Sequence, residues 1–256
     1  MCYRAALKTI RERRPLVHCI SNIVSANDCA NLLLSVGASP MMAQAEEEMA
    51  DIAALSSAAV LNTGTPDAAR FCLCARRGIL AEARNTPVIL DPVGVGASSW
   101  RREQLTAMLA SLRPSIVRVN LSEALALLGC AARERGVDSD ADLGAEGGSC
   151  ARALARKLSA TVLLSGDTDY VSDGERSFRV CGGSAMMTAV TGSGCMLSAL
   201  CGAFAAVEPD AFQAACMAAH FWKDCAARAE ACAGERGPGS FRVSLIDAAY
   251  QLSTGA

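Results

Sequence analysis

The residues best suited to chemistry lie in the run 190–196, VTGSGCM, where a serine separates two glycines and a cysteine follows. The run leads into a helix-like stretch at residues 196–206 that is rich in Ala, Leu and Gly. A glycine turn at a helix start leaves backbone N–H groups unpaired, and the helix dipole favours negative charge there, so a phosphate fits. A thiol beside such a site, that of Cys195, points to phosphoryl transfer or to thiol chemistry. A helix N-terminus also predicts a lowered pKa for this thiol, so that its thiolate could accept a proton.

Further polar residues come at the ends of apolar runs. Asp91 precedes a glycine-rich loop and either controls charge around a phosphate-bound Mg²⁺ or caps a turn. Arg118 lies inside an apolar run, where an unpaired guanidinium is costly to bury, and its planar fork can clamp phosphate oxygens. Asn120 and Glu123 either point into the same site or form a helix capping box. Ser165, followed by glycine, either contacts a nucleotide phosphate or forms a simple tight turn.

Two residues nearer the N-terminus are candidates for a ligand pocket. Asn22 and Met42 could line a site for a small, partly apolar molecule, although Met42 equally suits core filling. His18 and His220 lie in apolar surroundings, so we interpret both as packing residues. Cys195 has its own simpler interpretation, because one of thirteen cysteines is most often a small buried apolar residue.

The elements that would position these residues alternate between short apolar strands and longer helical patterns. Strands are predicted at residues 16–20, 58–62, 87–91, 115–119 and 161–165, with a helix at 27–36, a hairpin formed by 169–171 and 177–180, and helices from 195 onward. Continuous apolar strands between helices predict a parallel sheet covered on both faces, with ligands at the carboxyl ends of the strands. The proline at position 66 suits a helix start, and residues 136–149 are expected to be a mobile loop. Without a repeat or linker, residues 1–256 are expected to form a single domain.

Charge, apolar runs and cysteine content argue against nucleic-acid, membrane and zinc partners. A net charge of -2 and a pI near 5.8 give no basic footprint for nucleic acid. No apolar run reaches the roughly 18 residues of a membrane span, so no membrane partner is expected. The thirteen cysteines, with no secretory leader, favour reduced thiols in the cytoplasm. The Cys72–Cys74 pair has no matching second pair, which argues against zinc.

Several segments together resemble the hydroxyethylthiazole kinase family of the ribokinase-like superfamily, over nearly the whole chain. They are residues 15–22 (PLVHCISN), 27–31 (NDCAN), 37–42 (GASPMM), 61–65 (LNTGT), 90–97 (LDPVGVGA), 118–123 (RVNLSE), 190–195 (VTGSGC) and 237–241 (GPGSF). Each segment alone is weak evidence for the family, whereas the order and spacing of all eight segments are specific to it. The resemblance implies a three-layer α/β fold with a mostly parallel central sheet and helices on both faces. It also implies ATP-dependent phosphorylation of the hydroxyl of 4-methyl-5-(2-hydroxyethyl)thiazole with Mg²⁺, in thiamine biosynthesis or salvage.

The resemblance assigns roles to individual residues. It implies that Met42 and Gly192 contact the thiazole, and that Arg118 and Ser165 contact ATP. Cys195 stands where the wider superfamily has an aspartate base. The family further implies a homotrimer with sites between subunits, in which Met42 would serve a neighbour's pocket.

Combining both lines of reasoning gives an expected site. The thiazole lies against Asn22, with its hydroxyl near the cysteine, and the ATP phosphates lie along the glycine turn that contains Gly194. Mg²⁺ bridges phosphate oxygens and meets Asp91 and Glu123, directly or through water. The resemblance places the pair formed by Asn120 and Glu123 in the superfamily's metal–phosphate network.

Two positions depart from the family pattern. Val119 stands where glycine is usual, which would restrict the backbone near ATP, and Ser165 replaces a common threonine but keeps the hydroxyl. Three alternatives stay open: a kinase for another small alcohol such as a hydroxymethylpyrimidine, an acyl-transfer enzyme with Cys195 as nucleophile, and a non-catalytic thiazole-binding protein. The acyl-transfer alternative needs an orienting base, and neither histidine follows a predicted strand.

Overall fold

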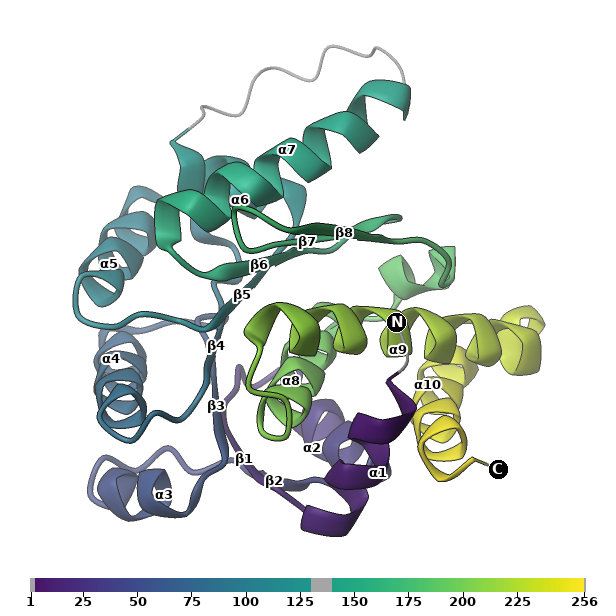
Figure 1. The fold of residues 1–256 in the computed structure, drawn as a ribbon, viewed down its shortest axis with the longest axis horizontal. Helices are drawn as coiled ribbons and strands as arrows, with labels where there is room; N and C mark the ends of the chain where they lie inside the picture. The colour runs from purple at the N-terminus through teal and green to yellow at the C-terminus, as the bar shows by residue number, and fades with distance from the viewer. Residues whose placement is uncertain (1–2, 130–139, 256) are drawn as a thin grey trace.

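A central sheet of eight strands organises the chain, whose computed structural model describes residues 3–129 and 140–255 (Figure 1). The strand order is β2-β1-β3-β4-β5-β6-β7-β8; pairing is parallel from β2 to β6, and β7 and β8 continue antiparallel. The strands are β1 Leu16–Ile20, β2 Ser39–Met41, β3 Ala58–Asn62, β4 Val88–Asp91, β5 Ile116–Val119, β6 Thr161–Leu164, β7 Asp169–Ser172 and β8 Ser177–Val180.

Helices cover both faces of this sheet (Figure 1). The helices are α1 Arg4–Arg13, α2 Ala26–Ser35, α3 Met49–Leu55, α4 Ala68–Glu82, α5 Ser99–Leu109, α6 Leu121–Leu128, α7 Asp140–Leu158, α8 Ser193–Ala205, α9 Ala211–Ala233 and α10 Pro238–Thr254, with short 3₁₀ turns at Val95–Ala97, Ala185–Ala189 and Gly234–Arg236. Helices α1, α2 and α8 to α10 pack on one face and α3 to α7 on the other, each against its own apolar core. Because side chains alternate along a strand, Val17 and Cys19 join the first core and Ile20 the second. None of the described helices is long and apolar enough to cross a membrane.

Most of the expected elements are confirmed. The strands at 16–20 and 58–62 have the predicted bounds, the hairpin forms, and the helix expected at 27–36 runs one residue earlier at each end. The expected start at position 66 is wrong by two residues, because Asp67 caps α4 by accepting a hydrogen bond from the backbone N–H of Arg70. The edge strand β2 was not predicted, since three residues that include Pro40 show no strand periodicity.

The prediction of a loop at residues 136–149 is wrong for residues 140–149, which are helical. Residues 136–139 lie outside the described residues, and the chain from Asp140 onward is the first part of α7. Gly147 is buried, and a Cβ atom there would lie 2.8 Å from the Tyr170 ring. The helix therefore needs a glycine to pack closely on β7, and this packing outweighs the poor helix propensity of the glycines.

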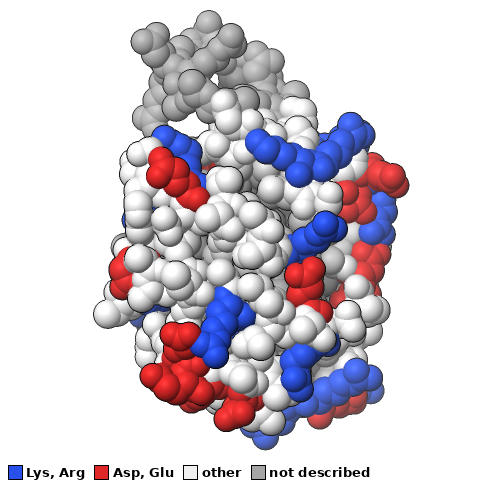
Figure 2. Space-filling model, turned by 90° about the vertical axis from the view of Figure 1, so that its left-hand side faces the viewer, with Lys and Arg blue, Asp and Glu red and all other residues white. Residues whose placement is uncertain are grey.

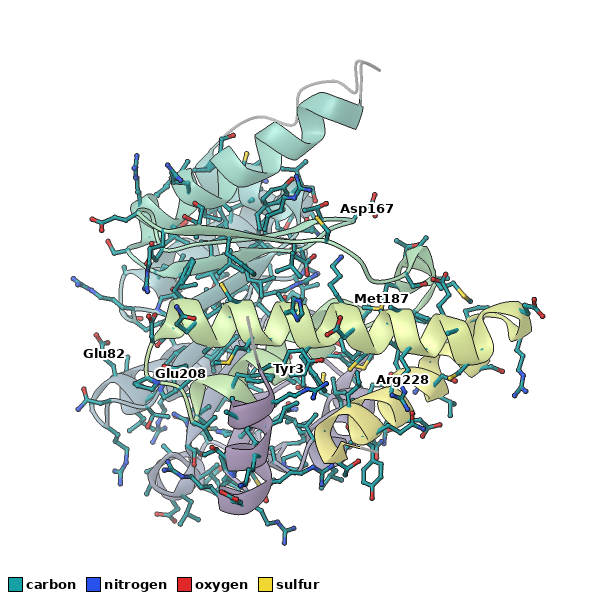
Figure 3. The ribbon with its side chains drawn as sticks, turned by 45° about the vertical axis from the view of Figure 1, so that its right-hand side comes forward. Tyr3, Glu82, Asp167, Met187, Glu208 and Arg228 are labelled. Atoms are coloured by element: carbon teal, nitrogen blue, oxygen red, sulfur yellow. The ribbon has the colours of Figure 1, made fainter. Side chains whose placement is uncertain are left out.

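The register of the parallel strands gathers their carboxyl ends at one edge. Ile20 lies beside Leu61, and Asn62 lies beside Asp91. Figure 3 shows this edge through the labelled Asp167 and Met187, while Glu82 and Glu208 mark the opposite edge. Figure 2 views the outer face of α3 to α5, where acidic and basic side chains are interspersed.

Candidate active site

Cys195 lies in the first turn of α8, at the carboxyl edge of the sheet. The helix begins at Ser193, and its N-cap, Gly192, has a φ of 79°, a left-handed value that favours glycine. A Cβ atom at Gly192 would also lie 2.8 Å from the Cβ of Ser25. Both the backbone angle and the close approach of α2 therefore require glycine in this turn.

Two amides hold the thiol of Cys195. Its Sγ accepts hydrogen bonds from Nδ2 of Asn22 at 3.3 Å and from Nδ2 of Asn62 at 3.1 Å. Asn22 also donates to Oδ1 of Asn62 at 3.0 Å, and Asn62 donates to Oδ2 of Asp91 at 2.6 Å. This chain of contacts, from Asn22 through Asn62 to Asp91, is called the amide relay below.

Asn62 was missed by sequence reasoning. Its position as the last residue of a confirmed strand was the available clue, because polar residues at that place meet the ligand edge of a parallel sheet. Its side-chain oxygen also accepts the backbone N–H of Gly64 at 2.8 Å, so its amide is fixed in one orientation. The orientation directs N–H groups to both Asp91 and Cys195.

Arg118 lies between the acidic residue and the glycine turn. Its Nη1 is 3.6 Å from Oδ1 of Asp91, which is fully buried, and its Nη2 donates to Oγ of Ser165 at 2.6 Å. The guanidinium lies directly against the backbone of Gly194, since a Cβ atom added there would collide with it. The structure therefore brings together Arg118, Ser165 and Gly194, the three residues expected to hold ATP.

Val119, the residue that departs from the family glycine, points the other way. Its side chain is fully buried in the core beneath α3 to α7, whereas the side chain of Arg118 lies on the opposite face of the sheet. The valine side chain therefore packs in the core and does not contact the Arg118 guanidinium.

Glu123 serves as a brace beneath the loop that follows β4. Its Oε1 accepts the backbone N–H of Gly94 at 2.9 Å, and its Oε2 accepts that of Asn120 at 2.9 Å. Asn120 accepts the N–H of Glu123 at 2.9 Å, which completes a capping box at the start of α6. Burial raises the pKa of Glu123, although these hydrogen bonds and Arg118 act in the other direction. The capping interpretation is thus confirmed.

The environment of Cys195 contradicts the expected lowering of its pKa. Burial, followed by the nearby negative charge of Asp91, raises the pKa of the Cys195 thiol to about 11. Hydrogen bonding by Asn62 and the charge of Arg118 oppose this rise without cancelling it. The thiol is therefore protonated at neutral pH.

Met42 follows the edge strand β2, one strand beyond Asn22. It is half-buried and packs against the same core as Cys195. His18 and His220 form no part of the site, in agreement with their interpretation as packing residues. His18 is fully buried on the α4 side of the sheet, and the His220 ring contacts the Tyr3 ring at a tilt of 46°, with ring centroids 5.6 Å apart.

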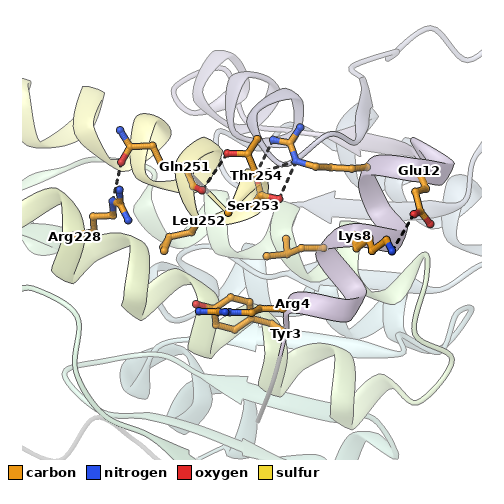
Figure 4. A pocket seen from close by; sticks show the side chains of 12 residues that line it. Tyr3, Arg4, Lys8, Glu12, Arg228, Gln251, Leu252, Ser253 and Thr254 are labelled. Carbon is orange, nitrogen blue, oxygen red and sulfur yellow. Dashed lines mark hydrogen bonds and ion pairs between the residues drawn. The ribbon is translucent and has the colours of Figure 1, made fainter.

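A groove of about 650 Å³ lies away from this site, where α1 meets α9 and α10 (Figure 4). Arg11 lines the groove and donates to Oγ of Ser253 at 2.7 Å and to the carbonyl of Ser35 at 2.7 Å. The groove therefore belongs to the joint between the terminal helices.

Comparisons with known proteins identify the family of the chain. The model of the hydroxyethylthiazole kinase family matches residues 7–255. Hydroxyethylthiazole kinases of Listeria monocytogenes (serovar 1/2a) and Nitratidesulfovibrio vulgaris (strain DP4) are 43% and 45% identical to the chain, covering 94% and 95% of it and 90% of each relative.

Solved structures agree as well. The structure of a hydroxyethylthiazole kinase protein from Pyrococcus horikoshii OT3 superposes with a TM-score of 0.86 at 38% identity, covering 97% of this chain and 92% of that one. A ribokinase-like superfamily protein from Enterococcus faecalis V583, at 12% identity and a TM-score of 0.64 over 98% and 89% of the two chains, shares the fold alone. The chain therefore belongs to the hydroxyethylthiazole kinase family and has the ribokinase-like fold.

Proposed function

We propose that the protein transfers the terminal phosphoryl group of ATP to the hydroxyl of 4-methyl-5-(2-hydroxyethyl)thiazole, in thiamine biosynthesis or salvage. The observation that carries the proposal is the convergence of Cys195, the amide relay and Arg118 on one glycine turn, in a chain of this family. Phosphoryl transfer depends mainly on positioning and on neutralising charge, and this edge of the sheet supplies groups for both.

The acceptor alcohol would lie on the Asn22 side of Cys195. Asn22, Met42 and the Gly192 backbone would line the thiazole pocket, with the hydroxyl directed at Sγ. In its thiolate form, Cys195 would accept the hydroxyl proton as the oxygen attacks phosphorus. The amide relay holds Sγ from two sides, so the base has a fixed position before the substrate arrives.

ATP would lie along the strand ends on the other side of the turn. Arg118 and the Ser165 hydroxyl would contact phosphate oxygens, and the first N–H groups of α8 around Gly194 would complete the cradle. The close approach of the guanidinium to the Gly194 backbone supports a shared phosphate site, because one phosphate group could then contact both.

The residues present fit Mg²⁺ carried on the nucleotide. Oδ1 of the buried Asp91 accepts no hydrogen bond from any described residue, and a carboxylate oxygen is a ligand that Mg²⁺ prefers. Glu123 has both oxygens engaged by backbone N–H groups and would act through water. No cluster of three or more potential ligands occurs among the described residues, so phosphate and water oxygens would complete the shell. Bound there, the ion would neutralise phosphate charge.

Direct product detection tests the proposal. Purified protein, MgATP and the thiazole alcohol should give the thiazole phosphate ester, identified by mass spectrometry, while Arg118→Ala should give much less at limiting ATP. Phosphorylation of a hydroxymethylpyrimidine in preference to the thiazole would favour the alternative kinase. Calorimetric binding of the thiazole without product would favour the non-catalytic alternative.

We also propose that the chain acts as a homotrimer in the cytoplasm. Ile23 and Val24 follow Asn22 and are 81% and 57% exposed, which suits a neighbouring subunit beside the thiazole pocket. Light scattering on the purified protein measures the subunit number.

The state of the cysteines supports the cytoplasmic location. Eleven cysteines of the described residues are free, which suits a reducing compartment.

A further inference from the structure

Helix α4 packs on the face of the sheet opposite α8, the helix that carries Cys195 (Figure 1), and its sequence includes three arginines. Arg70 and Arg77 are seven residues apart, so they share one face of the helix, two turns from each other. Arg76 lies next to them on the exposed side. Arg70 and Arg77 are called the arginine clamp below.

Arg70 joins two loops. Its Nη1 donates to the backbone carbonyl of Ser21 at 2.7 Å, and its Nη2 donates to Oε1 of Gln44 at 3.1 Å. Ser21 immediately precedes Asn22, and Gln44 lies two residues beyond Met42. One half-buried guanidinium therefore ties together the segments that carry Asn22 and Met42, the two side chains proposed to contact the thiazole.

Arg77 reaches the second loop through a histidine. Its Nε donates to Nδ1 of His18 at 2.8 Å, which leaves the proton of the neutral ring on Nε2. Nε2 then donates to the backbone carbonyl of Ala43 at 2.9 Å. Both side chains are fully buried, and burial lowers the pKa of His18 to about 4, so the ring stays neutral at neutral pH.

We propose that the arginine clamp is a positioning device for acceptor recognition, in which Arg70 and Arg77 fix the loop at residues 42–44 against the exit of β1. The proposal rests on the proposed function, since it assigns Asn22 and Met42 to the thiazole side. ATP binding should be insensitive to changes in the clamp. The residues proposed to hold ATP lie on β5 (Arg118), directly after β6 (Ser165) and in the first turn of α8 (Gly194), whereas the clamp acts next to β1 and β2.

Arg76 supplies a matched control on the same helix. Its guanidinium pairs with Glu46, and both side chains are largely exposed, at 47% and 69%. An exposed ion pair of this kind contributes little to structure. Arg76→Ala should therefore leave the loop unchanged, while it removes an arginine adjacent to the clamp.

The test compares Arg70→Gln, Arg77→Met and Arg76→Ala by kinetics and by amide hydrogen exchange. We expect the KM for the thiazole alcohol to rise about tenfold in the two clamp variants, because each loses one or two hydrogen bonds. The KM for ATP should be unchanged. Exchange at residues 39–46 should accelerate in the same two variants and stay at the wild-type rate in Arg76→Ala.

The two readouts separate failure of the clamp from failure of the proposed function. Wild-type exchange rates in Arg70→Gln would overturn the clamp, whatever the substrate is. Faster exchange with an unchanged thiazole KM, or with equal rises in both KM values, would overturn its role in acceptor recognition. Absence of thiazole phosphorylation by the wild-type protein would refute the proposed function, and hydrogen exchange would still test the clamp. If Arg77→Met does not fold, the half-exposed Arg70 carries the test alone.

Discussion

Replacing Cys195 with aspartate tests the proposed base most sharply. With a thiol pKa of about 11, only about one molecule in 10⁴ carries the thiolate at pH 7. The rate of the wild-type protein should therefore rise about tenfold per pH unit through the neutral range, as the fraction of thiolate grows. An aspartate carboxyl has an ordinary pKa of about 3.9, so it stays largely ionised at pH 7 even when burial and Asp91 raise its pKa.

The size of the change follows from two opposing effects. Ionisation increases the fraction of active base by about 10⁴ at pH 7. A carboxylate is a weaker base than a thiolate. With a Brønsted slope near 0.5, a difference of about four to six units between the two pKa values lowers the reactivity of the carboxylate by about 10²- to 10³-fold. The net expectation for Cys195→Asp at pH 7 is a turnover raised by about 10- to 100-fold over that of the wild type, with a nearly flat pH profile.

The assay is the initial rate of ADP release at saturating MgATP and thiazole alcohol, from about pH 6 to about pH 9.5. Cys201→Ala is the matched control, because Cys201 is a fully buried thiol on the same helix and should leave the pH profile unchanged. Cys195→Ala should lower turnover yet leave measurable activity, since positioning supplies most of the catalysis. A Cys195→Asp profile as steep as that of the wild type, or a Cys195→Ala turnover equal to it, would refute the base assignment.

Three further substitutions probe the surroundings of the thiol. Arg118→Ala should raise the KM for ATP about 10- to 100-fold through the lost charge-assisted contacts, and an unchanged ATP affinity would remove Arg118 from the site. Val119→Gly should lower the free energy of unfolding by about 3 kcal/mol because it opens a cavity in a core strand; the KM for ATP should stay within about twofold, and a large fall in that KM would restore valine as a nucleotide determinant. Glu123→Ala should destabilise the protein by about 1–3 kcal/mol by stranding two backbone N–H groups, and an unchanged melting temperature would argue against its role as a brace.

Much of the fold follows from the sequence because parallel strands buried on both faces are continuous apolar runs. The strand 58–62 shows this most clearly, since Ala58 to Leu61 are buried and Asn62 ends the run. The strand at 39–41 could not be found in the same way, because only its pairing with β1 defines it. The start of α7 was missed since local glycine preference is overridden by contact with Tyr170, a residue distant in the sequence.

The candidate site was predictable to the extent that strand ends converge. Asp91, Arg118 and Ser165 were singled out at three strand exits, and the structure joins them in one set of contacts. Asn62 was missed because an asparagine at a strand end has no distinguishing neighbours in sequence. The direction of the pKa change at Cys195 was wrong because both of its main causes, burial and the proximity of Asp91, appear only when distant segments pack together.

Two members of the amide relay, Asp91 and Asn62, should shift the pKa of the Cys195 thiol in opposite directions. Asp91 raises the pKa of the Cys195 thiol and Asn62 lowers it, so Asp91→Asn should move the midpoint of thiol alkylation to lower pH and Asn62→Ala should move it to higher pH. Each change should be on the order of one pH unit. Peptide mapping after iodoacetamide treatment isolates Cys195 from the exposed thiols, of which Cys232 serves as the internal reference. Shifts of the same sign in both variants would mean that altered solvent access controls the thiol. Opposite shifts would mean that the pair formed by Asp91 and Asn62 sets the charge state of the base, so that any ligand neutralising Asp91 also makes Cys195 easier to ionise.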